Sequence, residues 1–277
     1  MRNHQAVTQL LVKLLLAPSF VVGASLAARR YGPRIGGLVA GLPVVAGPIL
    51  LAYALAHGPG FAAGAAAGTL LGLVSLIAFS VVYGRLAGRL SWGPCMLAGW
   101  IAFAVCTAVF SAFSIADGLA LGLAALAIAG GLALLPRPAP PGPPGDPLPG
   151  WDLPLRAACA LTLVLTLTAI AGWLGPQLSG LLAPFPIIAT VLATFTHGQR
   201  GVDEMLRLVR GMVSGFAAFA LFFFTLATSL RPLGTAGGFA LATSVALLTQ
   251  SLAFALTGRR ETAALAPADA TLPAPLR

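Results

Sequence analysis

One stretch of the sequence occurs twice, 143 residues apart and without a gap. Residues 32–46 read GPRIGGLVAGLPVVA, and residues 175–189 read GPQLSGLLAPFPIIA. Seven of the fifteen positions are identical, including the glycines and prolines at the start and the proline near the end. The same register still matches Phe79 with Phe222. A chain that keeps Gly and Pro in register over this distance predicts a duplicated structural unit.

The composition indicates that this unit lies in a membrane. Hydrophobic residues make up 58% of the 277 residues and charged residues 8%, whereas a water-soluble domain carries about 25% charged residues. The net charge of +9 would suggest a nucleic-acid partner in a soluble protein. Here the basic residues are scattered over short loops, so we expect the lipid bilayer and no nucleic acid as partner. The three cysteines show no disulfide or metal-binding spacing, and no metal or cofactor is expected.

We predict an all-α polytopic membrane protein with about nine transmembrane helices, because nine apolar segments approach the length of about 20 residues that spans a bilayer. The fifth segment, 118–135, is the shortest. Residues 1–28 could be read as a signal peptide, but 10–28 align with 153–171 at the same offset and are therefore assigned to the repeat. The predicted segments are 9–28, 35–56, 62–83, 93–114, 118–135, 155–172, 177–197, 211–229 and 236–257.

The nine segments divide into two repeats of four helices with one unpaired helix between them. Residues 136–150 contain eight prolines and predict a stiff cytoplasmic linker, and the Ala/Pro/Thr-rich tail predicts disorder. The predicted units are a first membrane repeat at 8–114, a linking helix at 115–135, the linker at 136–150, a second, inverted repeat at 151–257 and a tail at 258–277.

An odd number of helices before the second repeat predicts that the two repeats are inverted relative to each other in the membrane. The basic residues agree with this arrangement: with the helices numbered in order, thirteen fall on one face and only Arg2, Lys13 and Arg231 on the other. By the positive-inside rule the first face is cytoplasmic. We therefore expect a bacterial inner-membrane protein with a periplasmic N-terminus and a cytoplasmic C-terminus.

The repeated motif places Pro43 and Pro186 well inside their helices, where each proline breaks a backbone hydrogen bond and bends or interrupts the helix. Interrupted helices at matching positions of two inverted halves indicate a central transport site, although a proline kink can also serve packing alone. We predict that the two prolines face each other across the bundle, and the repeat-equivalent Gly37 and Gly180 of the same motif are included in the predicted site.

Lys13 and Arg156 also match between the repeats, each near the start of the first helix of its half. Such residues often anchor a helix at the membrane surface, but Lys13 lies on the face that otherwise avoids basic residues. No Asp or Glu lies deep in a predicted span, so an anionic substrate is favoured. The predicted substrate-binding set is Lys13, Gly37, Pro43, Tyr53, Arg156, Gly180, Pro186, Thr190, Thr194 and His197.

The stretch GLLAPFPIIATVLATFTHGQRG at 180–201, preceded by a basic residue at the start of an apolar helix, resembles the small bacterial inner-membrane proteins of the GlpM type. Arg156, Pro184, Pro186, Ala189 and Gly201 match positions of that pattern, and His197 departs from it. The first copy of the motif is similar to a related uncharacterised family. The resemblance implies a fused pair of such units in a bacterial inner membrane, with a loose link to exopolysaccharide production and no established substrate.

Two functions remain open from the sequence. The first is a transporter or flippase-like carrier that moves an anionic or anionic-headed small molecule by alternating access at a pseudo-twofold site. The alternative is a non-transporting membrane protein of envelope or exopolysaccharide assembly. An enzyme is not expected, because the sequence has no HExxH motif and no paired acidic residues within the spans. The sequence leaves open whether the chain forms a homo-oligomer.

Overall fold

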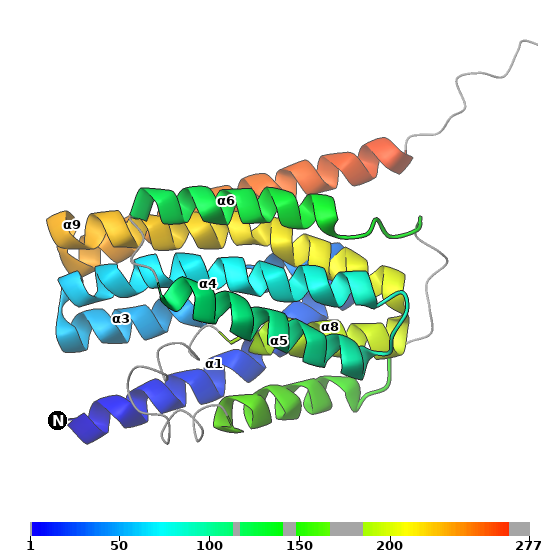
Figure 1. Cartoon of the computed structure of the whole chain (residues 1–277), viewed down its shortest axis with the longest axis horizontal. Coiled ribbons are helices and arrows are strands. Elements are labelled where there is room, and N and C mark those ends of the chain that lie inside the picture. The colour runs from blue at the N-terminus through cyan, green and yellow to red at the C-terminus, as the bar shows by residue number, and fades with distance from the viewer. Residues whose placement is uncertain (1, 113–116, 141–147, 167–184, 266–277) are drawn as a thin grey trace, which may run out of the picture.

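A computed structural model describes the backbone of residues 2–112, 117–140, 148–166 and 185–265, and the side chains of these ranges between residues 17 and 255. All regular secondary structure in this part of the chain is helical, so the predicted all-α class is confirmed for it. A helix without a label in Figure 1 covers residues 152–166. The labelled helices are α1 (Arg2–Tyr31), α2 (Pro33–Ala40), α3 (Ala46–His57), α4 (Pro59–Leu86), α5 (Trp92–Ser111), α6 (Asp117–Leu134), α8 (Ile187–Arg200) and α9 (Val202–Leu265).

The helices lie side by side, with their axes roughly along the longest dimension of the molecule (Figure 1). Four of the described helices are long and apolar enough to cross a membrane: α4, α5, α6 and the Val202–Ala255 part of α9. The protein is therefore a helical membrane protein. A described helix overlaps each of the nine predicted spans, but the number of spans and the inversion of the repeats stay predictions.

The helix α9 contains a chain reversal. Gly234 has φ 67° and ψ −178° inside it, which glycine adopts without the strain that a β-carbon would add. Without a turn, the 64 residues of α9 would extend about 96 Å, against about 30 Å for the apolar layer of a bilayer. We call residues 202–233 the first limb and residues 235–265 the second limb. The two limbs run antiparallel, side by side (Figure 1). The ring centroids of Phe222 on the first limb and Phe239 on the second limb are 6.3 Å apart.

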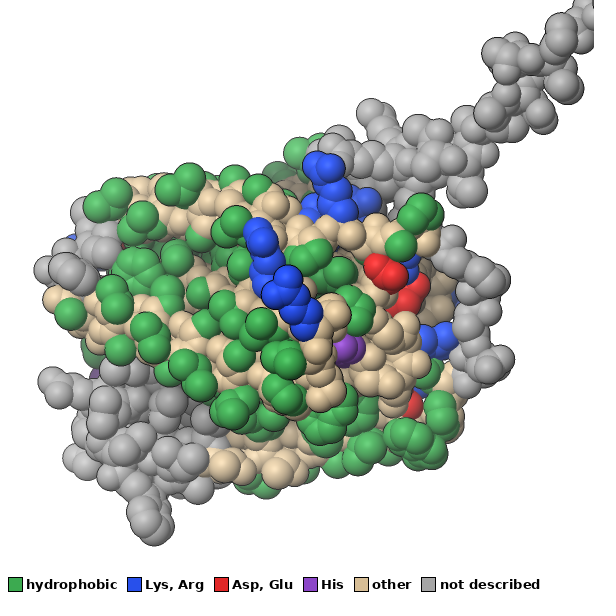
Figure 2. Space-filling model, turned by 45° about the vertical axis from the view of Figure 1, so that its right-hand side comes forward, with side chains coloured by type: hydrophobic (Ala, Val, Ile, Leu, Met, Phe, Trp, Pro, Cys, Tyr) green, Lys and Arg blue, Asp and Glu red, His purple; other side chains and the backbone are tan. Residues whose placement is uncertain are grey.

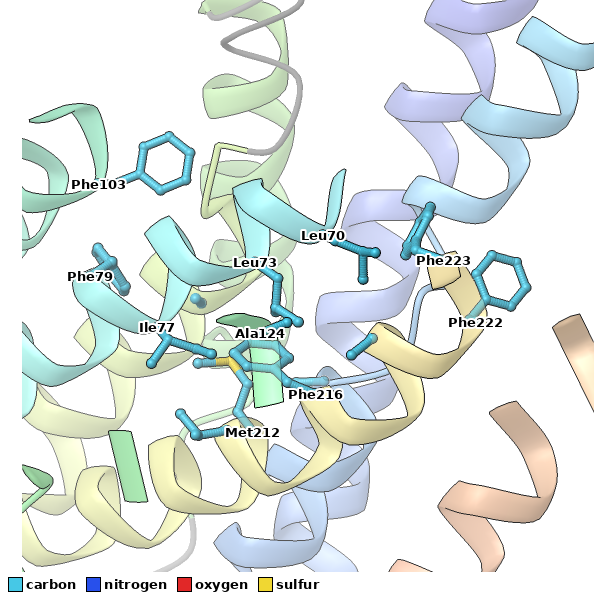
Figure 3. Close-up of a cluster of buried hydrophobic side chains, with 14 of the residues drawn as sticks. Leu70, Leu73, Ile77, Phe79, Phe103, Ala124, Met212, Phe216, Phe222 and Phe223 are labelled. Atoms are coloured by element: carbon cyan, nitrogen blue, oxygen red, sulfur yellow. The ribbon is translucent and has the colours of Figure 1, made fainter. Parts of the chain in front are cut away.

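The centre of the molecule lies between α4 and the first limb of α9. Leu70, Leu73 and Ile77 of α4 are buried against Met212 and Phe216 of α9 (Figure 3). Around this centre, α5 and α6 pack on α4, and α2 packs on α9.

The turns that precede the two central helices have the same geometry at repeat-equivalent positions. Gly58 has φ 86° and ψ 166°, and Gly201, 143 residues later, has φ 84° and ψ −177°. The N–H of Gly58 donates to the carbonyl of Ala54 at 3.0 Å, and the N–H of Gly201 donates to that of His197 at 3.2 Å. The offset of the sequence repeat therefore also relates the local structure of these two turns.

Basic side chains from α4 and α9 lie at one end of the molecule. Arg85 donates to the carbonyl of Leu134 at 2.6 Å, and Arg207 donates to that of Ala139 at 2.6 Å. Arg210 donates to two carbonyls at the C-terminal end of α6, at 2.9 and 2.8 Å. Figure 2 brings this end forward and shows charged side chains in its centre and right, with hydrophobic side chains over the flanks. These arginines belong to the face predicted to be cytoplasmic; the side of the membrane on which they lie stays a prediction.

Several predicted boundaries lie partly outside the described residues. The linking helix predicted at 115–135 corresponds to α6, which begins at Asp117 and ends at Leu134. Residues 141–147 of the linker and 266–277 of the tail are not described. The helix α9 continues through residues 258–265, which the sequence assigns to a disordered tail.

Candidate functional site

The first copy of the repeated motif forms two short helices separated by a break. The helix α2 ends at Ala40 and α3 begins at Ala46, with Pro43 between them. The N–H of Leu42 donates to the carbonyl of Val39 at 3.0 Å, a tighter turn than in an α-helix. The 8 residues of α2 and the 12 of α3 rise about 12 and 18 Å. Because the apolar layer is about 30 Å thick, the break lies within it if both helices cross the membrane as one span.

An open pocket of about 330 Å³, which we call the cavity at Pro43, lies beside this break. One side is formed by the break and α3, including Leu42, Pro43 and Gly47, and the other side by both limbs of α9, including Phe222 and Thr243. Thr243 carries the one polar side chain among the described residues that line the cavity. The volume is at the lower end of the range of small-molecule sites, roughly 300–1,000 Å³. The cavity joins the first repeat to the last two predicted spans of the second.

Glycines hold α2 against the first limb of α9 next to this cavity. A β-carbon on Gly41 would come within 2.8 Å of the backbone of Gly215, and one on Gly37 within 2.7 Å of the backbone nitrogen of Met212. Such close approach of two backbones is the usual role of small residues between membrane helices. The predicted site residue Gly37 therefore lies at a helix crossing that holds the wall of the cavity in place.

A buried amide also connects the two halves here. Gln250 on the second limb of α9 is 3% exposed, and its Nε2 donates to the carbonyl of Leu38 at 2.8 Å. Its Oε1 has no hydrogen-bond partner among the described residues. A hydrogen bond to a helix carbonyl near a break satisfies part of the polar surface that lipid cannot. Gln250 thus connects the second limb of α9 to α2.

The second copy of the motif has different surroundings. Pro186 directly precedes α8, and its carbonyl accepts the N–H of Thr190 at 2.8 Å. The indole N–H of Trp100 on α5 donates to the hydroxyl of Thr190 at 2.9 Å. The cavity at Pro43 has no lining residue from α8. Pro43 is therefore seated against α9, whereas the motif around Pro186 is seated against α5; that the two prolines face each other stays a prediction.

Three predicted site residues, Thr190, Thr194 and His197, lie on α8. The predicted site residue Tyr53 lies on α3. Thr190 and Thr194 are buried, and the hydroxyl of Thr194 donates to the carbonyl of Thr190 at 2.8 Å. The Nδ1 of His197 and the hydroxyl of Tyr83 on α4 are 3.3 Å apart. Tyr53 instead packs on α3 against the rings of two neighbours at the helix end. The structure thus brings the α8 residues together and leaves Tyr53 apart from them.

Arg156 belongs to a buried charge cluster, which we define as Arg29, Asp152, Arg156 and Gln199. Asp152 is 0% and Arg156 4% exposed, and the guanidinium Nε lies 2.9 Å from both carboxylate oxygens. Arg29 donates to Asp152 at 2.6 Å, and Arg156 donates to Gln199 at 3.1 Å. The cluster joins the end of α1, the start of the helix 152–166 and the end of α8. The guanidinium of Arg156 is therefore already paired within the protein.

The electrostatics of Asp152 follow from these partners. Burial acts to raise the pKa of the carboxyl, but hydrogen bonds from Arg29, Arg156 and Gln199 stabilise the carboxylate more strongly, and the pKa lies below its usual value. Asp152 is thus a carboxylate in the folded protein. The ring of Phe195 covers the other side of the cluster, 5.1 Å from the Arg156 guanidinium carbon.

Two predicted site residues cannot be placed, because the side chain of Lys13 and the whole of Gly180 lie outside the described residues. Conversely, sequence reasoning does not include Asp152, Gln199, Trp100 or Gln250 in the site. The spacing of Asp152 and Arg156, four residues apart on one helix, was an available signal. The remaining contacts join distant parts of the chain and have no local signature.

Within the described residues, no group of three His, Cys, Asp or Glu side chains could hold a metal ion. The geometry therefore offers an apolar cavity at a broken helix and, at the basic end, a buried cluster in which two arginines share one carboxylate. Comparison of the chain with protein-family models, curated proteins and solved structures found no match.

Proposed function

We propose that this protein is a flippase-like membrane carrier that moves an amphipathic molecule with an anionic head group by alternating access. The observation that carries the proposal is the cavity at the Pro43 break, which lies between the first repeat and both limbs of α9. A broken helix next to a cavity is where membrane transporters hold their substrates. Movement of one half against the other would change the access to this cavity.

The anionic head group is supported by the distribution of charge. Arginines from α4 and α9 lie at one end of the described part of the chain. The acidic side chains that the structure describes are Asp117, Asp152, Asp203 and Glu204. Asp152 is neutralised by Arg29 and Arg156, and Glu204 by Arg207 at 2.6 Å. Each basic residue near the surface attracts an anionic lipid head by about 1 kcal/mol. An anionic head is therefore favoured at this end, and a cation is not.

The test is exchange of fluorescent lipids in proteoliposomes, which requires no knowledge of an energy source. Vesicles with the purified protein would contain a trace of head-group-labelled phosphatidylglycerol, and dithionite would bleach the label on the outer leaflet. We expect bleaching beyond the half that protein-free vesicles show, and less exchange of an equally labelled neutral lipid. Folded, correctly inserted protein that leaves bleaching at one half for every lipid tested would instead favour the role in envelope assembly.

A matched pair of proline variants tests the role of the break. Pro43→Ala restores a backbone N–H at the break and should reduce exchange, because it favours a continuous helix. Pro59→Ala changes a proline at the start of α4, where the ring fits the first helical turn, and should leave exchange unchanged. Equal exchange by the two variants contradicts the proposal.

A further inference from the structure

The cavity at Pro43 has a counterpart in the other half of the chain that is filled. At the offset of 143 residues, Thr243 corresponds to Trp100, Ala246 to Phe103, and Leu42 to Phe185. The rings of Trp100 and Phe185 lie 5.3 Å apart, and those of Phe103 and Phe185 lie 5.7 Å apart. The side chains of Trp100, Phe103 and Phe185 therefore fill the region of the other half that is equivalent, by the repeat, to the cavity at Pro43.

The cavity results from smaller side chains at these same positions. Where α5 presents Trp100 and Phe103, the second limb of α9 presents Thr243 and Ala246. Where α8 has Thr190, which accepts the indole hydrogen bond, α3 has Gly47. The adjoining wall is unchanged, because Phe79 and Phe222 occupy equivalent positions. Figure 3 shows Phe79 with Phe103 on one side of the core and Phe222 on the other. Aromatic side chains thus fill the region beside α8, whereas the equivalent region beside α3 is left open as the cavity at Pro43.

The lining of the cavity indicates the chemistry of its occupant. Thr243 is exposed and has no hydrogen-bond partner among the described residues, and the other lining side chains are apolar. The pocket is open, and apart from the Thr243 hydroxyl its lining offers no polar side chain among the described residues, so the lining favours an apolar occupant. Leu51 at its rim is 37% exposed and Leu247 is 58% exposed, so the cavity is reached from the apolar flank of the molecule. In a membrane, that flank is covered by lipid chains.

We propose that the cavity at Pro43 binds one acyl chain of a membrane lipid, in the place that Trp100, Phe103 and Phe185 fill in the other half. The charged head group of that lipid lies outside the cavity, because no charged side chain lines it among the described residues. This inference deepens the proposed carrier function. Only the statement that the protein also moves the bound lipid across the membrane rests on that proposed function. Its binding part is independent of transport.

The experiment uses the full-length protein in vesicles that contain phosphatidylglycerol with a photoreactive diazirine near the end of one acyl chain. After irradiation, mass spectrometry would identify the labelled peptides. We expect labelling of residues 42–51 and 239–247 in the wild type. Thr243→Trp with Ala246→Phe copies the residues of the filled half into the cavity, and should reduce this labelling at least tenfold.

A reciprocal variant provides the matched control. Trp100→Thr with Phe103→Ala empties the filled side and should add labelling around residues 185–190, while the Pro43 cavity keeps its label. Thr243→Phe alone serves if the double variant does not fold, and folding is checked by elution and thermal unfolding in detergent. Unchanged labelling of 42–51 in both folded cavity-filling variants overturns the inference.

The outcomes of this experiment and of the lipid-exchange experiment are distinguishable. Labelling that depends on the cavity without any lipid exchange supports the acyl-chain site and counts against the carrier. Exchange that continues in Thr243→Trp with Ala246→Phe, together with unchanged labelling, counts against the acyl-chain site alone.

Discussion

Gly41 at the C-terminal end of α2 and Gly215 on α9 lie backbone against backbone, so that a β-carbon on Gly41 would come within 2.8 Å of the Cα of Gly215. We predict that Gly41→Leu forces the two helices apart and destabilises the protein by about 1–3 kcal/mol, as overpacking does. The measurement is thermal unfolding in detergent. Gly68→Ala on α4 is the control, because outside the adjacent backbone of its own helix no described atom lies within 4 Å of the added β-carbon. Similar melting temperatures for the two variants would contradict this role of the crossing.

Asp152→Asn should destabilise the protein, because it leaves the buried Arg156 guanidinium without its counter-charge. Loss of one partner of a buried pair costs about 3–5 kcal/mol. Asp117→Asn, at the start of α6, is the control, because Asp117 makes no ion pair among the described residues. The double variant Asp152→Asn with Arg156→Gln should recover part of the loss, and a further additive loss would show that the pair contributes nothing.

The same carboxylate predicts a pH dependence of stability. Because the pKa of Asp152 is lower in the folded protein than its usual value, folding is favoured by this group at neutral pH. This contribution is lost as the pH falls below the unfolded value of about 3.9 and through the folded one. Melting temperatures from about pH 6 to pH 3 should therefore fall less steeply for Asp152→Asn than for the wild type. Parallel curves would contradict the assignment.

The hydrogen bond from Trp100 to Thr190 should couple α5 to α8. We expect a double-mutant cycle of Trp100→Phe and Thr190→Val to give a coupling energy of about 0.6 kcal/mol, the average for such bonds in membrane proteins. Thr194→Val is the control, because the Thr194 hydroxyl bonds within its own helix. It should show no coupling to Trp100→Phe.

The burial of Arg156 changes how the anionic-substrate hypothesis is tested. Replacing Arg156 alone would leave the buried Asp152 with Arg29 as its one remaining ion-pair partner among the described residues, so a loss of transport would not be separable from a loss of stability. Lys13→Gln in the otherwise unchanged protein should reduce exchange of labelled phosphatidylglycerol, with the amount of folded protein unchanged. Asp152→Asn with Arg156→Gln keeps the net charge and should exchange the lipid as the wild type does, where it folds. Unchanged exchange in Lys13→Gln contradicts a role for that cation.

The helical class and the break at Pro43 could be predicted from sequence because both depend on local rules. Apolar segments in lipid must satisfy their backbone within helices, and proline lacks the N–H that a continuous helix needs. The offset of the repeat also relates two turns, at Gly58 and Gly201, because the φ and ψ angles of these two glycines are similar.

The site could be predicted less well because its contacts depend on which helices become neighbours. The sequence matches Lys13 with Arg156, but it does not show that Arg29 from a distant helix would share Asp152 with Arg156. It likewise shows that Thr243 and Trp100 are equivalent without showing that one position lines a cavity and the other fills it. Such differences arise from packing between helices, which periodicity and composition do not report.

The hydrogen bond from Gln250 to the carbonyl of Leu38 spans 212 residues. This separation determines how long after Leu38 its partner is synthesised. A ribosome that adds 5–20 residues per second needs about 10–40 s to produce Gln250 after Leu38. During that interval α2 is already made while its partner in the last helix does not exist. A newly made chain that stops before residue 250 therefore leaves the carbonyl of Leu38, beside the broken helix, without this hydrogen bond.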